Sequence, residues 1–238
     1  MPPQHYLWQV IVFGEHLLAL GCAVAFCFGA VGGAALASEE GEVILSEPRR
    51  DGEFAVERAL ALRRSIRDFA PGPLSLVAVS QLLWAAQGVT HPDGLRTTPS
   101  AGALQPLEVY LVAGAVTGLE PGVYRYDPRR HRLSLQSAGD SRAGVVQATL
   151  GQDWVAEAPA IIVLAGVYQR TSRKYGARAR RYVHMEMGHA AQNVYLQATA
   201  LGLGTTLVGA FRDDKLAEVL ELPKHIEPLG LLPIGTPR

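Results

Sequence analysis

Beyond residue 50, apolar and polar residues follow periodicities that predict a mixture of helices and short strands. The longest helical signal covers 181–201, where apolar residues recur at steps of three and four and make one continuous face. Short apolar runs of strand length cover 107–113, 160–167, 205–211 and 229–234. Because these helices and strands mix without regular βαβ alternation, we predict an α+β layered domain.

Capping and turn residues mark the remaining elements. Ser75 is placed to cap a helix that runs to about Gly88. The preceding Pro71-Gly72-Pro73 breaks the chain. The same kinds of signal predict a helix at 53–64, a hairpin at 122–135 and a last helix at 212–222.

The N-terminal part of the chain contains a long uncharged run. Residues 17–37 suit a bilayer crossing in length and apolar content, and the run ends in the pattern Ala35-Leu36-Ala37 that signal peptidase accepts. We therefore expect 1–37 to be a signal peptide or a single membrane anchor, 38–52 a linker and 53–238 the folded domain. This organisation predicts an exported or membrane-associated protein.

Basic residues are missing from this leader, since the first one is Arg49, whereas signal peptides normally begin with Lys or Arg. A misassigned start codon would explain their absence and would give a cytoplasmic protein. The charges that flank the run would place the C-terminal side of an uncleaved anchor in the cytoplasm. Cleavage and retention both stay open.

The composition excludes several classes of protein. The 238 residues are 48% apolar and include 22 basic and 22 acidic groups, which excludes a disordered chain and a nucleic-acid binder held by bulk charge. Cys22 and Cys27 both lie in the leader, so the folded domain has neither disulfides nor cysteine-ligated metals. Hydrolase, zinc-protease and Walker motifs are absent from the sequence.

A cluster of basic residues follows the first predicted helix. Arg63, Arg64 and Arg67, together with the hydroxyl of Ser65, could bind a phosphate, because guanidinium groups match phosphate geometry and stay charged. The alternative is a solvated basic helix end that favours the helix dipole.

Two runs of small residues could bring main-chain amides close to a flat or anionic ligand. One contains Pro99, Ser100, Ala101 and Gly102, and the other is Gly202-Leu203-Gly204 after the longest helix. Their alternatives are a plain surface turn and an ordinary helix stop.

Lys174 and Tyr175 form a candidate proton-transfer pair within a basic stretch. The alternative is a solvated basic loop. His184 and His189 lie five residues apart on the longest helix, off a common face, and we interpret them as structural.

Taken in order, these segments resemble the nitroreductase superfamily of FMN-dependent oxidoreductases, and more closely its SagB/ThcOx-type dehydrogenase branch. The resemblance covers about 55–238. It is carried by residues 63–69, 82–88, 99–104, 174–176, 188–196, 201–204 and 232–235.

The resemblance implies an α+β fold with a central mixed or antiparallel sheet flanked by helices, in an intertwined homodimer that binds FMN noncovalently at the subunit interface. It implies that the loop from Pro99 to Gly102 contacts the flavin of the partner subunit, and that Gly202-Leu203-Gly204 lies near the isoalloxazine edge. The residues that it implies for the phosphate and ribityl chain are Arg63, Ser65 and Arg67, with Arg238 as the only candidate for a further basic contact.

The implied function is hydride transfer through flavin N5 to or from a small organic or peptide-derived substrate, with NAD(P)H as a possible donor and Lys174-Tyr175 in proton removal. Two departures from the branch are Gln105, where a Tyr is usual, and the early C-terminus. They leave open a flavin-binding protein without turnover, and the leader leaves open an exported flavin-free binding protein.

Overall fold

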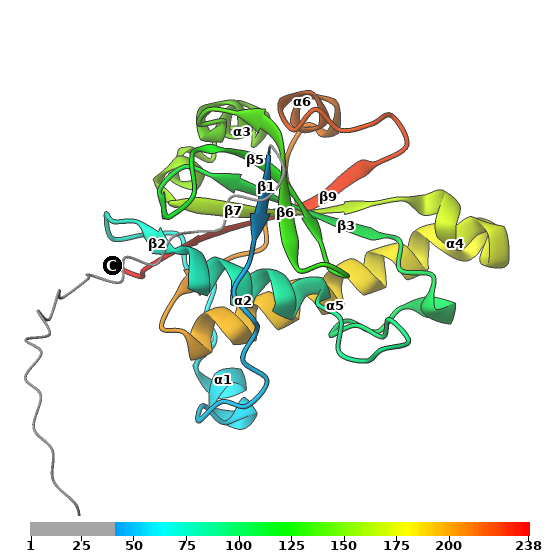
Figure 1. Ribbon diagram of the computed structural model, residues 1–238. Coiled ribbons are helices and arrows are strands. Elements are labelled where there is room, and N and C mark those ends of the chain that lie inside the picture. Colours follow the sequence, from blue (N-terminus) through cyan, green and yellow to red (C-terminus); the bar gives the residue numbers. More distant parts are fainter. Residues whose placement is uncertain (1–40) are drawn as a thin grey trace, which may run out of the picture. The chain divides into compact units, whose positions relative to one another are not determined.

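The computed structural model describes residues 41–238 (Figure 1). Within this part of the chain, one seven-stranded sheet has the order β1-β6-β5-β3-β7-β9-β8, and every neighbouring pair is antiparallel. The strands are β1 (Glu42–Ile44), β3 (Leu107–Ala113), β5 (Gly122–Asp127), β6 (Arg132–Ala138), β7 (Ala160–Gly166), β8 (Gly204–Thr205) and β9 (Glu227–Gly235). Parallel pairing occurs in a separate short sheet of β2 (Leu74–Ser75) and β4 (Val116–Thr117).

Helices cover both faces of the large sheet. On one face, α2 (Leu76–Gln87) and α5 (Ala179–Ala200) pack on a core that includes Val109 and Leu111. On the other face, α3 (Arg142–Ala148) and α6 (Asp213–Val219) pack on a second core that includes Tyr110 and Val112. Successive residues of β3 therefore point to opposite cores, which is why this strand is buried along its whole length and apolar at every position except Glu108. The remaining helices are α1 (Val56–Leu62), α4 (Tyr168–Tyr175) and the 3-10 turns η1 (Ala101–Ala103), η2 (Asp153–Glu157) and η3 (Gly176–Arg178).

The predicted α+β architecture is confirmed, as are its longest helix, now α5, and the β5–β6 hairpin. Ser75 caps α2 as expected, because its Oγ accepts a hydrogen bond from the amide of Ala78 at 3.2 Å. The strand predicted at 205–211 is shortened to β8, and beyond it Val208 pairs with Leu231 only through an isolated bridge.

The region that we assigned to a linker contributes a strand. Residues Glu42–Ile44 pair with β6 as β1, at the edge of the sheet. Val43 packs against the first core and Leu45 is buried in it, so two inward side chains stabilise this edge strand. The apolar run Val43-Ile44-Leu45 is too short and too closely flanked by acidic residues to show a strand period in the sequence.

The predicted export or membrane association is corrected by the structure. Among the helices of residues 41–238, none combines the length and the apolar character that a bilayer crossing requires. The segment 1–37, on which the prediction of a signal peptide or anchor rested, lies outside the described residues.

Candidate flavin site

The first arginine-rich segment lies against the end of the sheet. After α1 the chain becomes extended, Ser65 forms a parallel bridge with Thr205, and the amide of Ile66 donates to the Thr205 carbonyl at 3.0 Å. A Cβ at Gly204 would lie 2.7 Å from the Ile66 side chain, so only glycine allows this approach. Two segments that are about 140 residues apart in the sequence are thereby brought into contact.

Tyr195 of α5 holds this junction together. Its hydroxyl lies 3.3 Å from Ser65 Oγ, donates to Thr206 Oγ1 at 3.1 Å, and accepts from the amide of Leu207 at 2.7 Å. The Arg63 guanidinium lies 5.4 Å from the centre of its ring. Burial alone would raise the pKa of Tyr195, but these hydrogen bonds and the Arg63 charge outweigh burial and lower it. Nothing in the local sequence around Tyr195 predicted this role.

Arg67 lies farther along the same segment, where the chain meets the C-terminus. The Arg67 guanidinium lies 5.9 Å from the centre of the Trp154 ring. The adjacent Asp68 pairs with Arg238 at 3.1 Å and accepts from its amide at 3.2 Å. Because this ion pair is largely exposed, it holds Arg238 only weakly. The predicted phosphate residue Arg238 is therefore bonded to Asp68, which follows Arg67 in the chain.

Arg64 is placed differently from its neighbours. Its guanidinium donates to the carbonyls of Ala61 at 3.0 Å and of Arg63 at 2.8 Å. It therefore satisfies carbonyls at the C-terminal end of α1. The guanidinium groups of Arg63, Arg64 and Arg67 therefore do not all point to one binding position.

The second cluster joins the small-residue loop to Lys174 and Tyr175, the candidate proton-transfer pair. Gly102 has φ +63°, and a Cβ there would lie 2.8 Å from Tyr175 Oη and 3.1 Å from Lys174 Nζ. The loop main chain and these two side chains are therefore in direct contact. Tyr175 also packs edge-on against Tyr182, with the ring centres 4.9 Å apart.

The start of the loop is anchored to α2 and α5. The side-chain amide of Asn193 donates to the carbonyls of Ala85 at 3.1 Å and of Thr97 at 3.2 Å, and to Thr98 Oγ1 at 3.1 Å. Farther along the loop, Ser100 Oγ accepts from the amide of Gln105 at 2.8 Å. The residues just before Pro99 are therefore held in place, and a loop with a fixed start can position a ligand.

Glu186 is a buried carboxyl beside this loop that sequence reasoning missed. It is only 2% exposed, and its Oε1 has no hydrogen-bond partner among the described residues. Burial raises its pKa to about 7, against the opposing effects of the Ser100 hydroxyl and the Arg96 charge. Glu186 lies between Met185 and Met187 on the long helix, and this local sequence does not distinguish a buried carboxyl from an exposed one.

The two clusters lie at different levels of α5. Tyr195 marks the first and Glu186 the second, and nine residues of helix separate them by about 13 Å along the axis. The structure of one chain thus brings Arg63, Ser65 and Gly204 together, and it brings Gly102, Lys174 and Tyr175 together as a second group.

The substitution Glu186→Gln is expected to stabilise the protein at pH 8 by about 3 kcal/mol and to have little effect near pH 5. The folded-state pKa of about 7 exceeds the ordinary 4.5, so the unfolded chain releases this proton first. Folding is therefore disfavoured progressively as the pH rises from 4.5 to 7. Urea unfolding at both pH values measures the effect, and an equal gain at both would contradict it.

Gly102→Ala is expected to cost about 1 kcal/mol of stability, because alanine is strained at positive φ. It is also expected to lower turnover at least tenfold, because its methyl group displaces Tyr175 Oη and Lys174 Nζ. Gly118→Ala is the matched control, since Gly118 has φ +86° with nothing within 4 Å of a Cβ. Urea unfolding and steady-state rates distinguish the two, and equal turnover in both variants would show that the contact is unimportant.

Comparison with known protein families adds the decisive observation. Residues 60–236 match the nitroreductase family over most of the described chain. The chain belongs to the nitroreductase family. This membership confirms the resemblance and the fold inferred from the sequence.

Similar proteins are known both as sequences and as solved structures. A nitroreductase-family protein of Methanocaldococcus jannaschii, provisionally named a nitroreductase, is 48% identical over 185 residues, which cover 77% of this chain and 91% of that protein. The crystal structure of a Ralstonia eutropha protein with the same provisional name has a TM-score of 0.74 and 32% identity, and the match covers 86% of this chain and 93% of that one.

More distant members of the nitroreductase family show its chemical range. The microcin B17-processing protein McbC of Escherichia coli, a SagB-type relative, is 29% identical over 64% of this chain and 58% of its own length. The FMN reductase [NAD(P)H] of Bacillus subtilis is 26% identical over 76% of this chain and 66% of its own length. These relatives identify the chain as a flavin oxidoreductase in general terms.

Proposed function

We propose that this protein is an FMN-dependent oxidoreductase that acts as a homodimer. The observation that carries the proposal is the contact of Ser65 with Thr205 beside Gly204. It places guanidinium groups and a hydroxyl next to a glycine-containing main chain. Guanidinium groups suit the FMN phosphate, and an open main chain suits the close approach of a flat ring.

The residues of the first cluster fit a phosphate-bearing flavin. Neither Arg63 nor Arg67 forms an ion pair with any residue in 41–238, and both guanidiniums rest over aromatic rings. The buried hydroxyl of Thr205 has no hydrogen-bond partner in the same part of the chain. These groups therefore have unused capacity for a polar ligand.

When bound, FMN would supply hydride transfer at its N5 atom. Arg63, Ser65 and Arg67 would hold the phosphate and ribityl chain, and Arg238 would join them by leaving its exposed pair with Asp68. The main chain from Gly202 to Gly204 would line the edge of the ring.

The second cluster would serve the flavin of the partner subunit. The separation of the two clusters along α5 supports this arrangement, because each forms independently within one chain. Pro99 to Gly102 would orient the ring, while Lys174 and Tyr175 would hold or move the substrate proton. Light scattering is expected to give twice the mass of one chain, and a monomer that still turns over would remove this part of the proposal.

The proposed substrate is a small organic or peptide-derived molecule, with NAD(P)H as the electron donor. The FMN reductase relative supports the donor. McbC, a processing protein for microcin B17, supports the peptide-derived class.

Purification of the full chain tests the proposal. We expect a yellow protein, or one that takes up FMN on titration. Its flavin absorbance is expected to be bleached anaerobically by NAD(P)H and restored by a nitroaromatic or quinone. A protein that cannot take up FMN would refute flavin dependence. Bound FMN that no reductant reduces would favour a flavin-binding protein without turnover.

A further inference from the structure

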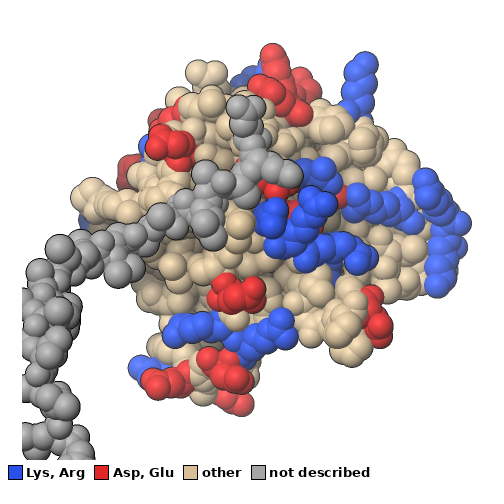
Figure 2. Space-filling model, viewed as in Figure 1, with Lys and Arg blue, Asp and Glu red and all other residues tan. Residues whose placement is uncertain are grey.

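A polar cavity lies away from the cluster of Arg63, Ser65 and Gly204. It has a volume of about 470 Å³ and is bordered by β3, β5 and β6, by the Leu104-Gln105 segment and by the start of α4. Figure 2 shows basic side chains gathered on this face, over β6 and β3 and toward α4. Its charged lining residues are Arg96, Arg125, Arg129, Arg130, Arg170, Glu42, Glu108 and Asp127.

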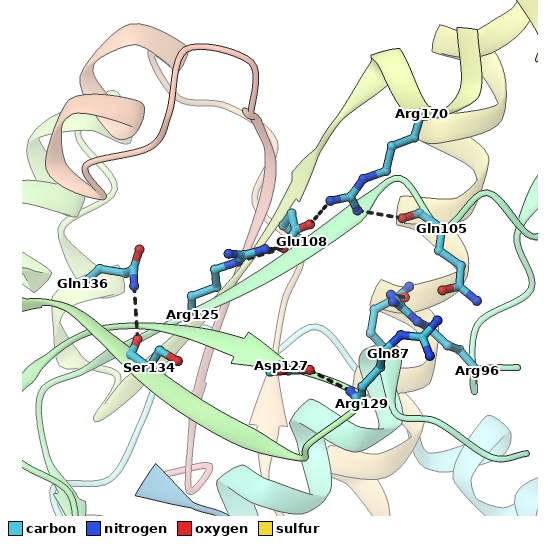
Figure 3. A network of polar contacts seen from close by, with 10 residues as sticks. All are labelled: Gln87, Arg96, Gln105, Glu108, Arg125, Asp127, Arg129, Ser134, Gln136 and Arg170. Carbon is cyan, nitrogen blue, oxygen red and sulfur yellow. Dashed lines mark hydrogen bonds and ion pairs between the residues drawn. The ribbon is translucent and has the colours of Figure 1, made fainter. Parts of the chain in front are cut away.

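One carboxylate in this lining is already satisfied. Glu108 is only 7% exposed and pairs with Arg125 at 2.9 Å and with Arg170 from the opposite side (Figure 3). Arg170 also donates to the Gln105 carbonyl at 2.9 Å. This triad fixes the wall of the cavity, because the two oxygens of Glu108 pair with Arg125 and Arg170.

Two other arginines have no carboxylate partner. Among residues 41–238, neither Arg96 nor Arg129 forms an ion pair, whereas Arg130 lies within 4.0 Å of both Glu42 and Asp127. In Figure 3 the side chains of Arg96 and Arg129 lie beside Gln87. Five arginines and three carboxylates line the cavity, and Glu42 pairs more closely with Arg132 outside the lining, at 2.9 Å, so the lining has an excess of at least two positive charges.

Buried donors at the same place also lack acceptors. Arg96 donates to Gln87 Oε1 at 2.8 Å, but Arg96 Nε and Gln87 Nε2 are buried without a hydrogen-bond partner among the described residues. Burial lowers the pKa of Arg96, and the charges of Arg170 and Arg129 add to this effect against Glu108 and Glu186. These two donors have almost no accessible surface, so the positive charge that a bound anion would offset is that of the guanidinium groups.

We propose that this cavity binds the phosphate group of a phosphorylated small molecule, with Arg96 and Arg129 as the principal contacts. A dianionic phosphate monoester matches the excess of two charges, and guanidinium donors match its oxygens. The volume exceeds that of a phosphate alone and lies within the range of small-molecule sites, so a molecule of nucleotide size fits. The proposal does not depend on flavin binding at the other cluster.

Calorimetric titration of the full chain with AMP, in phosphate-free buffer and with saturating FMN present, tests the proposal. We expect AMP to bind and inorganic phosphate to compete with it, while adenosine binds at least tenfold more weakly. If the chain takes up no FMN, the same titration is made on the double variant Arg63→Gln, Arg67→Gln. AMP can then no longer bind to the arginines of the other cluster. Failure of the flavin proposal is thereby separated from failure of this one.

Of Arg96 and Arg129, the exposed Arg129 is the better residue to replace. Arg129→Gln is expected to weaken AMP binding at least tenfold, since a hydrogen bond to a charged group is worth about 1.5 kcal/mol or more. Arg173→Gln removes an exposed arginine of α4 that is not part of the lining, and we expect it to bind AMP as the unaltered protein does. Equal AMP affinity in the two variants, equal binding of adenosine and AMP, or loss of AMP binding on addition of FMN would each overturn the proposal.

Discussion

Replacing Arg63 and Arg67 together by glutamine is expected to weaken FMN binding by roughly 100- to 10,000-fold. Each arginine would lose a charge-assisted hydrogen bond to the phosphate, worth about 1.5–3 kcal/mol. Both guanidiniums rest on aromatic rings and form no ion pair within residues 41–238, so their loss leaves no buried carboxylate unpaired. Quenching of FMN fluorescence on titration gives the dissociation constants.

Arg64→Gln is the matched control for this experiment, because it removes a neighbouring charge whose donors are committed to the carbonyls of Ala61 and Arg63. We expect it to change the dissociation constant of FMN by less than about threefold. If Arg64→Gln weakened binding as much as the double variant does, the assignment of the phosphate contacts would be wrong.

The double variant Lys174→Met, Tyr175→Phe is expected to slow one half-reaction of the enzyme at least 100-fold without changing FMN affinity. General acid–base groups contribute about 100- to 10,000-fold, and this pair lies directly against the loop that would meet the flavin. Stopped-flow absorbance can follow reduction by NAD(P)H and reoxidation by a nitroaromatic or quinone separately. The half-reaction that slows is the one in which the pair handles the proton.

Tyr182→Phe supplies the control, since Tyr182 packs edge-on against Tyr175 at 4.9 Å but is not proposed to touch substrate. Both half-reactions should keep their rates in this variant. Unchanged rates of both half-reactions in the Lys174 and Tyr175 variant would show that the pair has no catalytic role.

Local patterns predicted much of the fold. The spacing of apolar residues along α5 and the Ser75 cap are properties of neighbouring residues, and both appear in the structure as expected. The edge strands were harder to predict. β1 has three residues and β8 has two, so their pairing with β6 and β9 comes from the partner strands and leaves little local periodicity.

The sequence predicted which segments form the candidate site, but not how these segments lie relative to one another. The residue types of Arg63, Ser65 and Gly204 pointed to a phosphate and a flat ligand, but their contact depends on the sheet edge. Tyr195 and Glu186 gave no signal, because a hydroxyl that joins two segments and a carboxyl that is buried by distant ones acquire these properties only in three dimensions. Arg64 is the opposite case. Its residue type fits a phosphate site, but its side chain binds a carbonyl at the end of α1.

Parallel titrations of the unaltered protein with FMN and with riboflavin test the central claim most directly, because the two ligands differ only in the phosphate. A cradle made by Arg63, Ser65 and Arg67 predicts that FMN binds at least 100-fold more tightly than riboflavin. Equal affinities would contradict the account, because they would show that the arginines make no contact with the phosphate of FMN.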